Sequence, residues 1–86
     1  MCSSQDVSSL LRLRVVADAD PGAIARVLER FQNMNVVPRR MVAECGTNEV
    51  MHIEVDVFGL TPTLMELVTA KIRQSISVTR AHWHPL

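Results

Sequence analysis

The segment from Asp18 to Ile24 is the part of the chain best suited to binding a small ligand. Asp20 occupies the position of a helix N-cap and Pro21 the first helical position. A helix that begins there points N–H groups and the positive end of its dipole at the preceding loop, which favours an anion such as a carboxylate. Gly22 lets a ligand approach the backbone closely. The same residues also make an ordinary helix start, and the sequence leaves both interpretations open.

Three histidines suggest metal chemistry by their type. His82 and His84 are two residues apart in the last segment, and His52 lies in a segment of alternating polarity. All three are expected to point outward from strands, where histidines are usually solvated rather than bound to zinc. We therefore expect no metal and no cofactor.

Candidate nucleophiles and general acids lack the partners that catalysis needs. Cys45 stands beside Gly46 in a predicted turn, with no sign of an activating base. Glu54 and Asp56 are paired carboxylates, but arginines are available to neutralise them. We expect no catalytic residue, and hence a protein that is not an enzyme.

Composition excludes several partners. Nine Lys and Arg residues balance nine Asp and Glu residues, so no net field attracts nucleic acid or an anionic membrane. An RNA-recognition module needs aromatic side chains on its central strands, and this chain has two Phe, one Trp and no Tyr. We expect neither a nucleic-acid nor a membrane partner.

The two cysteines and the N-terminus indicate the compartment. Cys2 and Cys45 form no disulfide framework. Residues 1–8 lack the basic and apolar regions of a secretory signal and are expected to be a flexible tail. We expect a cytoplasmic protein with one domain over residues 9–84.

Four segments have the alternation of half-buried strands. Pro38 cannot donate to a central ladder, so the second segment is expected at a sheet edge. Cys45 to Asn48 is the expected turn between the second and third segments. In the second segment, Val37, Arg39, Met41 and Ala43 alternate with Pro38, Arg40, Val42 and Glu44, and as an edge strand it is expected to expose Val36, Val37, Met41 and Val42. The residues expected to face inward are Leu11, Leu13, Val15 and Ala17 in the first strand, Met51, Ile53, Val55 and Val57 in the third, and Ala81 and Trp83 in the last, Ser77 to His84.

Two segments have helical periodicity. The first begins at Pro21 and ends at Asn33 to Asn35; the second begins at Pro62, with Thr61 as its cap, and runs to about Ser75. The residues expected on the buried faces are Ile24, Val27, Leu28 and Phe31 in the first helix and Leu64, Leu67, Val68 and Ile72 in the second.

The resulting order is strand, helix, strand, strand, helix, strand. Right-handed crossovers then give an α+β, ferredoxin-like βαββαβ fold, with a four-stranded antiparallel sheet in the order 4-1-3-2 and two helices on one face. The open face is expected to carry Arg12 and Arg14 beside Glu54 and Asp56, flanked by Arg80, His82 and His84. Such a face is either solvated or packed against a partner.

The opening Asp-Ala-Asp-Pro-Gly-Ala-Ile-Ala-Arg-Val, residues 18–27, resembles that of ACT domains, and the similarity extends from Leu10 to Trp83. Gly22 to Phe31 is most similar to the small regulatory subunits of acetolactate (acetohydroxyacid) synthase. The chain resembles the short, ACT-only form of that subunit.

The resemblance implies a homodimer paired through edge strands. An amino-acid effector would lie between the loop before the first helix and the second strand of the partner. Gly22 matches the loop glycine of the family, whereas Ala19 and Val37 replace the two effector-binding asparagines. The residues that the resemblance assigns to the ligand site are Asp18, Ala19, Asp20, Gly22, Ala23, Ile24 and Val37.

Two functions stay open. In one, the chain is a regulatory subunit that activates the large catalytic subunit of acetolactate synthase in branched-chain amino-acid biosynthesis, with a weak or altered allosteric response to an amino acid. In the other, it is a free-standing ACT dimer that senses a small molecule or serves in assembly without a synthase.

Overall fold

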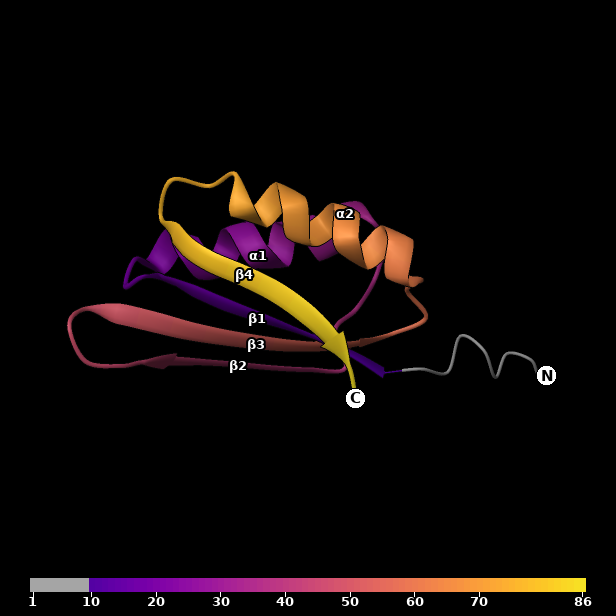
Figure 1. Ribbon diagram of the computed structural model, residues 1–86, viewed down its shortest axis with the longest axis horizontal. Coiled ribbons are helices and arrows are strands. Elements are labelled where there is room, and N and C mark those ends of the chain that lie inside the picture. Colours follow the sequence, from indigo (N-terminus) through magenta and orange to yellow (C-terminus); the bar gives the residue numbers. More distant parts are fainter. Residues whose placement is uncertain (1–9) are drawn as a thin grey trace.

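The computed structural model describes residues 10–86 and contains one sheet of four strands with two helices (Figure 1). The expected tail of residues 1–8 lies outside the described residues. Neither helix of the described part is long and apolar enough to cross a bilayer. The elements are β1 (Leu10–Asp18), α1 (Pro21–Asn33), β2 (Arg40–Cys45), β3 (Val50–Phe58), α2 (Pro62–Arg73) and β4 (Val78–Pro85).

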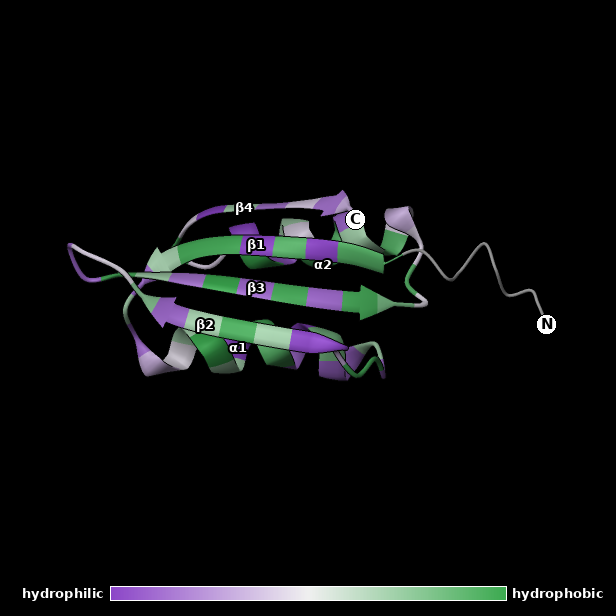
Figure 2. Cartoon of the chain, turned by 90° about the horizontal axis from the view of Figure 1, so that it is seen from below, coloured by the Kyte–Doolittle hydropathy of each residue, from purple (hydrophilic) through white to green (hydrophobic). Residues whose placement is uncertain are grey.

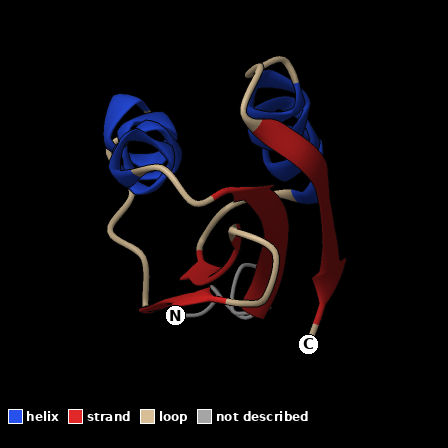
Figure 3. Ribbon diagram, turned by 90° about the vertical axis from the view of Figure 1, so that its left-hand side faces the viewer, coloured by secondary structure: helices blue, strands red, loops and turns tan. Residues whose placement is uncertain are grey.

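The sheet has the order β2-β3-β1-β4, and all three pairings are antiparallel. Both helices cover the same face of the sheet (Figures 1 and 3). The expected ferredoxin-like fold, its strand order and the edge position of the second strand are confirmed. A register shift between Val16 and Ala17 is the one irregularity in the pairing of β1 with β4.

The core lies between the sheet and the helices. The strands alternate between apolar and polar residues, so one face of the sheet is apolar and the other carries charge (Figure 2). The buried strand residues include all the inward residues predicted for β1 and β3, namely Leu11, Leu13, Val15, Ala17, Met51, Ile53, Val55 and Val57. Ala81 of β4 is buried too, and Trp83 is half-buried beside it.

Both helices begin as predicted. The Asp20 side chain accepts a hydrogen bond from the Gly22 N–H at 3.2 Å, and the Thr61 hydroxyl accepts one from the Leu64 N–H at 3.2 Å. Each cap precedes a proline at the first helical position. Asn35 has φ of 58°, which confirms the left-handed turn expected after α1.

The predicted buried faces of the helices are partly wrong. Leu28, Leu64 and Leu67 have exposed fractions of 40%, 37% and 55%. The buried positions are Ala23, Val27 and Phe31 in α1 and Met65, Val68, Thr69 and Ile72 in α2. Thr69 can be buried because its hydroxyl donates to the Met65 carbonyl at 2.7 Å, which satisfies its polar group inside the helix. In α2, Val68 and Ile72 are therefore buried as predicted, whereas Leu64 and Leu67 are exposed and Met65 and Thr69 take their place in the core.

The second strand was predicted to begin too early. β2 begins at Arg40, so Val37 precedes it and is 87% exposed. The Arg39 N–H donates to the Asp56 carbonyl at 2.7 Å, and pairing continues from there. The turn after β2 is also displaced, because the left-handed residues are Asn48 and Glu49, with φ of 61° and 58°. Asparagine accepts this conformation readily, so the chain reverses one residue later than the glycine suggested.

Candidate functional site

The loop that precedes α1 is anchored on both sides. The Asp18 N–H donates to the Ser77 carbonyl at 2.8 Å, and the Ala19 N–H donates to the Glu49 carbonyl at 3.0 Å. The first bond connects the loop to the segment before β4, and the second connects it to the turn between β2 and β3. The loop is thus held at the end of the sheet where the edge strand β2 finishes.

Asp20 itself occupies the N-terminus of α1. Its side chain accepts from the Gly22 N–H at 3.2 Å, and its carbonyl accepts from the Ala23 N–H at 2.9 Å. The N–H groups expected to bind an anion therefore already have acceptors within the chain. A ligand carboxylate must exchange with the Asp20 carboxylate to reach the Gly22 N–H.

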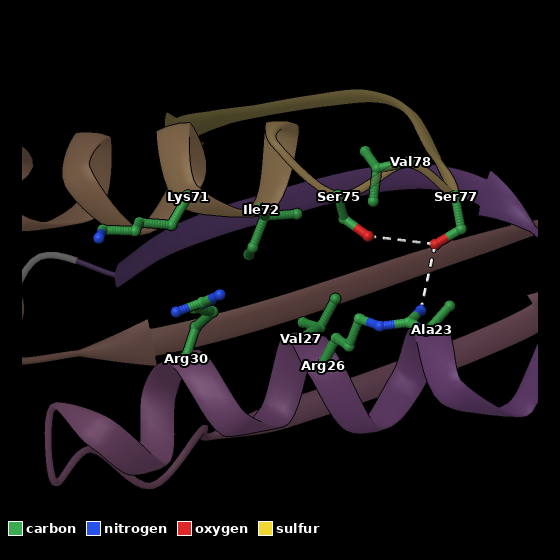
Figure 4. A pocket seen from close by; sticks show the side chains of 9 residues that line it. All are labelled: Ala23, Arg26, Val27, Arg30, Lys71, Ile72, Ser75, Ser77 and Val78. Carbon is green, nitrogen blue, oxygen red and sulfur yellow. Dashed lines mark hydrogen bonds between the residues drawn. The ribbon is translucent and has the colours of Figure 1, made fainter.

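Arg26 covers this end of the helix, a role that the sequence analysis did not assign. Its guanidinium lies 3.5 Å from an Asp20 carboxylate oxygen and donates to the Ser77 hydroxyl at 3.2 Å (Figure 4). A Cβ on Gly22 would lie 3.3 Å from the Arg26 Nη2 atom. The sequence signal that could have identified Arg26 is its spacing: it follows Gly22 by one helical turn and lies on the same face of the helix.

The structure brings most predicted ligand residues together and separates one. Asp18, Ala19, Asp20, Gly22, Ala23 and Ile24 all lie at the beginning of α1. Val37 lies beyond the other end of that helix, which has 13 residues and a length of about 20 Å. Within one chain, Val37 cannot share a ligand with the loop.

The open face of the sheet carries a network of ion pairs. The Arg12 guanidinium binds Asp56 in a bidentate manner, at 2.7 and 2.9 Å, and Arg40 binds Glu54 at 2.6 Å. Arg40 also lies 3.5 Å from Asp56, and Arg14 lies 3.5 Å from Glu54. Asp56 is only 3% exposed, although it points to the open side. The expected arginine–carboxylate pairs between β1 and β3 are present, and Arg40 of β2 contacts both carboxylates.

These arginines shift the titration of both carboxyl groups. The Arg12 hydrogen bonds and charge hold the pKa of Asp56 below its ordinary value of 3.8, and burial opposes this shift. The Arg40 hydrogen bond similarly lowers the pKa of Glu54. Both groups are carboxylates at neutral pH, paired with cations, and are not available as general acids or bases.

The histidines lie on the same face. His82 and His84 stack with ring centroids 6.3 Å apart, and the Arg14 Nε–H donates to His84 Nε2 at 3.4 Å. His52 lies on β3, opposite Val16 and Glu44. Within residues 10–86, no three side chains of His, Cys, Asp or Glu lie close enough together to hold a metal ion.

The comparisons with known proteins decide the family. Residues 4–86 match the ACT-like domain family. The chain belongs to that family. ACT domains are in general regulatory domains that bind small molecules rather than catalytic ones. No curated protein matches the sequence.

Solved structures share the fold of this ACT-like domain. The C-terminal domain of the MgtC protein from Mycobacterium tuberculosis has a TM-score of 0.78 and 16% identity, over 95% of this chain and 92% of that one. The ACT domain from GTP pyrophosphokinase of Chlorobium tepidum has a TM-score of 0.73 and 13% identity, over 90% of this chain and 100% of that one.

The same fold also occurs within a larger protein. In a homoserine dehydrogenase from Thiobacillus denitrificans, the similarity has a TM-score of 0.75 and 19% identity, over 91% of this chain but only 17% of that one. At this level of identity, these likenesses establish the fold and nothing further.

We expect the Asp56 carboxylate to make the stability of the ACT-like domain depend on pH. Its pKa is lower in the folded than in the unfolded chain, so its contribution is complete above about pH 5 and is lost as pH falls through the folded value. Asp56→Asn should reduce the free energy of unfolding at pH 7 by about 1.5–3 kcal/mol, the range for a charge-assisted hydrogen bond. Urea unfolding between pH 2 and pH 7 measures this.

The parent and Asp56→Asn should converge in stability at the acidic end of that range. Glu44→Gln, an exposed carboxylate on the same face, is the control and should change stability by less than about 0.5 kcal/mol. Parallel pH profiles for the parent and Asp56→Asn would contradict this account.

Proposed function

We propose that the chain is a non-catalytic regulatory domain that pairs through β2 with a second copy and binds a small amino acid between the two. The supporting observation is the anchoring of the Asp18–Gly22 loop beside the turn that ends β2, through the Ala19 N–H and the Glu49 carbonyl. Two-fold pairing of edge strands is antiparallel, so it brings the beginning of the partner's strand to the end of this one. The same pairing brings a second copy of the Val37 segment toward the loop.

The edge itself supports this pairing. β2 has one neighbour in the sheet, so its outer N–H and C=O groups have no partner strand in the described chain. Leu28, Val36 and Val37 form an apolar surface beside it, joined by Pro38. An unprotected edge next to apolar side chains favours association with another strand.

The loop supports an amino acid as the ligand. An amino-acid carboxylate can take the place of the Asp20 carboxylate on the Gly22 N–H. The displaced Asp20 and the exposed Asp18 then offer acceptors for the ammonium group. The exchange keeps the positive end of the α1 dipole occupied by a carboxylate.

For the partner, we propose the large catalytic subunit of acetolactate synthase, which the chain would activate. The support is the sequence of Gly22 to Phe31 alone. A free-standing dimer that senses an amino acid without a synthase is the alternative, and co-purification from native extract separates the two. The proposed setting is cytoplasmic, in keeping with a free, exposed Cys45.

We expect a homodimer at micromolar concentrations. Val37→Asp should shift it to a monomer, because the charge would be buried without a partner at the interface. Ile76→Asp is the matched control, since Ile76 is 101% exposed in the loop between α2 and β4, away from β2. Light scattering over a dilution series measures the mass. A parent that is monomeric at tens of micromolar, or a dimeric Val37→Asp variant, would contradict side-by-side pairing.

Gly22→Val should abolish amino-acid binding and leave the fold intact. The Gly22 φ is not in the left-handed region, and the nearest atoms to an added Cβ belong to the flexible Arg26 and Asp20 side chains. The larger side chain would fill the space that a ligand carboxylate needs. Ala25→Val adds bulk at an exposed position of the same helix and is the control. Titration calorimetry with a panel of amino acids would reject the site if Gly22→Val binds like the parent.

Valine should be a weak effector in the presence of a synthase. Replacing two asparagine amides by Ala19 and Val37 removes hydrogen bonds worth about 1.5–3 kcal/mol each, or about a hundredfold or more in affinity. The chain should therefore raise the turnover of its synthase without strong inhibition by valine. Acetolactate formation across a valine series measures this, and inhibition at micromolar valine would show that other groups replace the amides.

A further inference from the structure

A hollow between α1 and α2 is lined by cationic side chains. Arg26 and Arg30 of α1 and Lys71 of α2 line it together with the apolar side chains of Val27 and Ile72; Arg26 extends toward Ser77, and Arg30 and Lys71 lie toward the other end (Figure 4). A second, wider hollow shares Arg30 and Lys71 with the first. It continues over Met34, Leu67 and Val68, and its volume is about 290 Å³. That volume is close to the lower end of the range for small-molecule sites.

Two of the three cations have no acidic partner. Arg26 is held by Asp20 and the Ser77 hydroxyl. Among residues 10–86, neither Arg30 nor Lys71 lies within ion-pair distance of a carboxylate. Arg30 is half-buried and Lys71 is exposed, so two like charges line one hollow with water screening part of their repulsion. An anion between them would relieve this repulsion.

The helix dipoles explain only part of this arrangement. Arg30 lies in the last turn of α1 and Lys71 in the last turn of α2, where a positive charge is favourable. A cation in the last turn gains this interaction on any face of the helix. The dipoles therefore account for the presence of the charges but not for their convergence on one hollow.

We propose that the second, wider hollow binds a small phosphomonoester, with its phosphate between Arg30 and Lys71 and its apolar part over Leu67 and Val68. A phosphomonoester carries a charge of about −1.5 to −2 at neutral pH, which matches two unpaired cations. A carboxylate would neutralise only one. The guanidinium fork of Arg30 matches two phosphate oxygens, and Lys71 acts as a point charge. The apolar part of the ligand would cover the half-exposed Leu67 side chain.

The proposed phosphate position, between Arg30 and Lys71, is separate from the proposed amino-acid site, although the first hollow also reaches Ala23 and Arg26 at the beginning of α1. Arg30 and Lys71 line neither the Asp18–Gly22 loop nor the β2 edge. Binding of a phosphomonoester therefore does not depend on the amino-acid proposal, and either can fail alone.

NMR titration of the ¹⁵N-labelled full chain tests the proposal at constant ionic strength. The probes are n-butyl phosphate, inorganic phosphate and butyrate. Butyl phosphate should shift the amide signals around Arg30, Leu67 and Lys71 in a saturable way. Inorganic phosphate should bind more weakly because it lacks the apolar part, and butyrate should bind at least about tenfold more weakly because it carries a single charge.

Arg30→Gln and Lys71→Gln should each weaken binding of butyl phosphate by about tenfold or more. The control is Arg80→Gln, which removes an exposed arginine from β4 and should leave binding unchanged. The proposal is overturned by an absence of saturable shifts up to about 10 mM butyl phosphate. Equal affinity in the two variants and the parent, or equal affinity for butyrate and butyl phosphate, would also overturn it.

Discussion

The antiparallel pairing of β1 with β3 is the constraint on which the rest of the structure depends. All nine residues of each strand are paired, from Leu10 opposite Phe58 to Asp18 opposite Val50. On one face this register lines up the apolar side chains that support both helices. On the other it sets Arg12 opposite Asp56 and Arg14 opposite Glu54. A slip by one residue would turn these charges into the core, so the apolar and the charged faces both enforce the same register.

The sequence predicted the parts of the fold that depend on this alternation, and it predicted the helix starts. β1, β3 and the caps at Asp20 and Thr61 follow from local chemistry that a short segment carries by itself. The orientation of α2 does not follow from local chemistry, because Leu67 is exposed and Thr69 is buried, the reverse of what their hydrophobicity suggests. What decides between them is the fit against the sheet and an internal hydrogen bond from the Thr69 hydroxyl, and neither is visible in the pattern.

The candidate site was predictable to a similar degree. Residues 18–24 are adjacent in sequence, so their position at the beginning of one helix follows from the cap and the proline. Arg26 could be placed only once the direction of its side chain toward Asp20 and Ser77 was known. The hollow containing Arg30 and Lys71 joins residues that are 41 positions apart in the sequence, on two helices whose buried faces the periodicity predicted only in part. Tertiary packing creates such a site, and helical periodicity alone does not reveal it.

The Asp20 cap also sets the concentration scale of any carboxylate sensor built on this loop. Its side chain already occupies the Gly22 N–H, so it acts as a tethered competitor that is present in every molecule. Displacing an N-cap costs about 1 kcal/mol, which raises the ligand concentration needed for half-saturation about fivefold. Without a ligand, the Gly22 N–H therefore still has a hydrogen-bond acceptor, the Asp20 carboxylate. In such a sensor the helix would be complete without ligand, so the domain would stay folded at low ligand concentration while its response moved to higher concentrations.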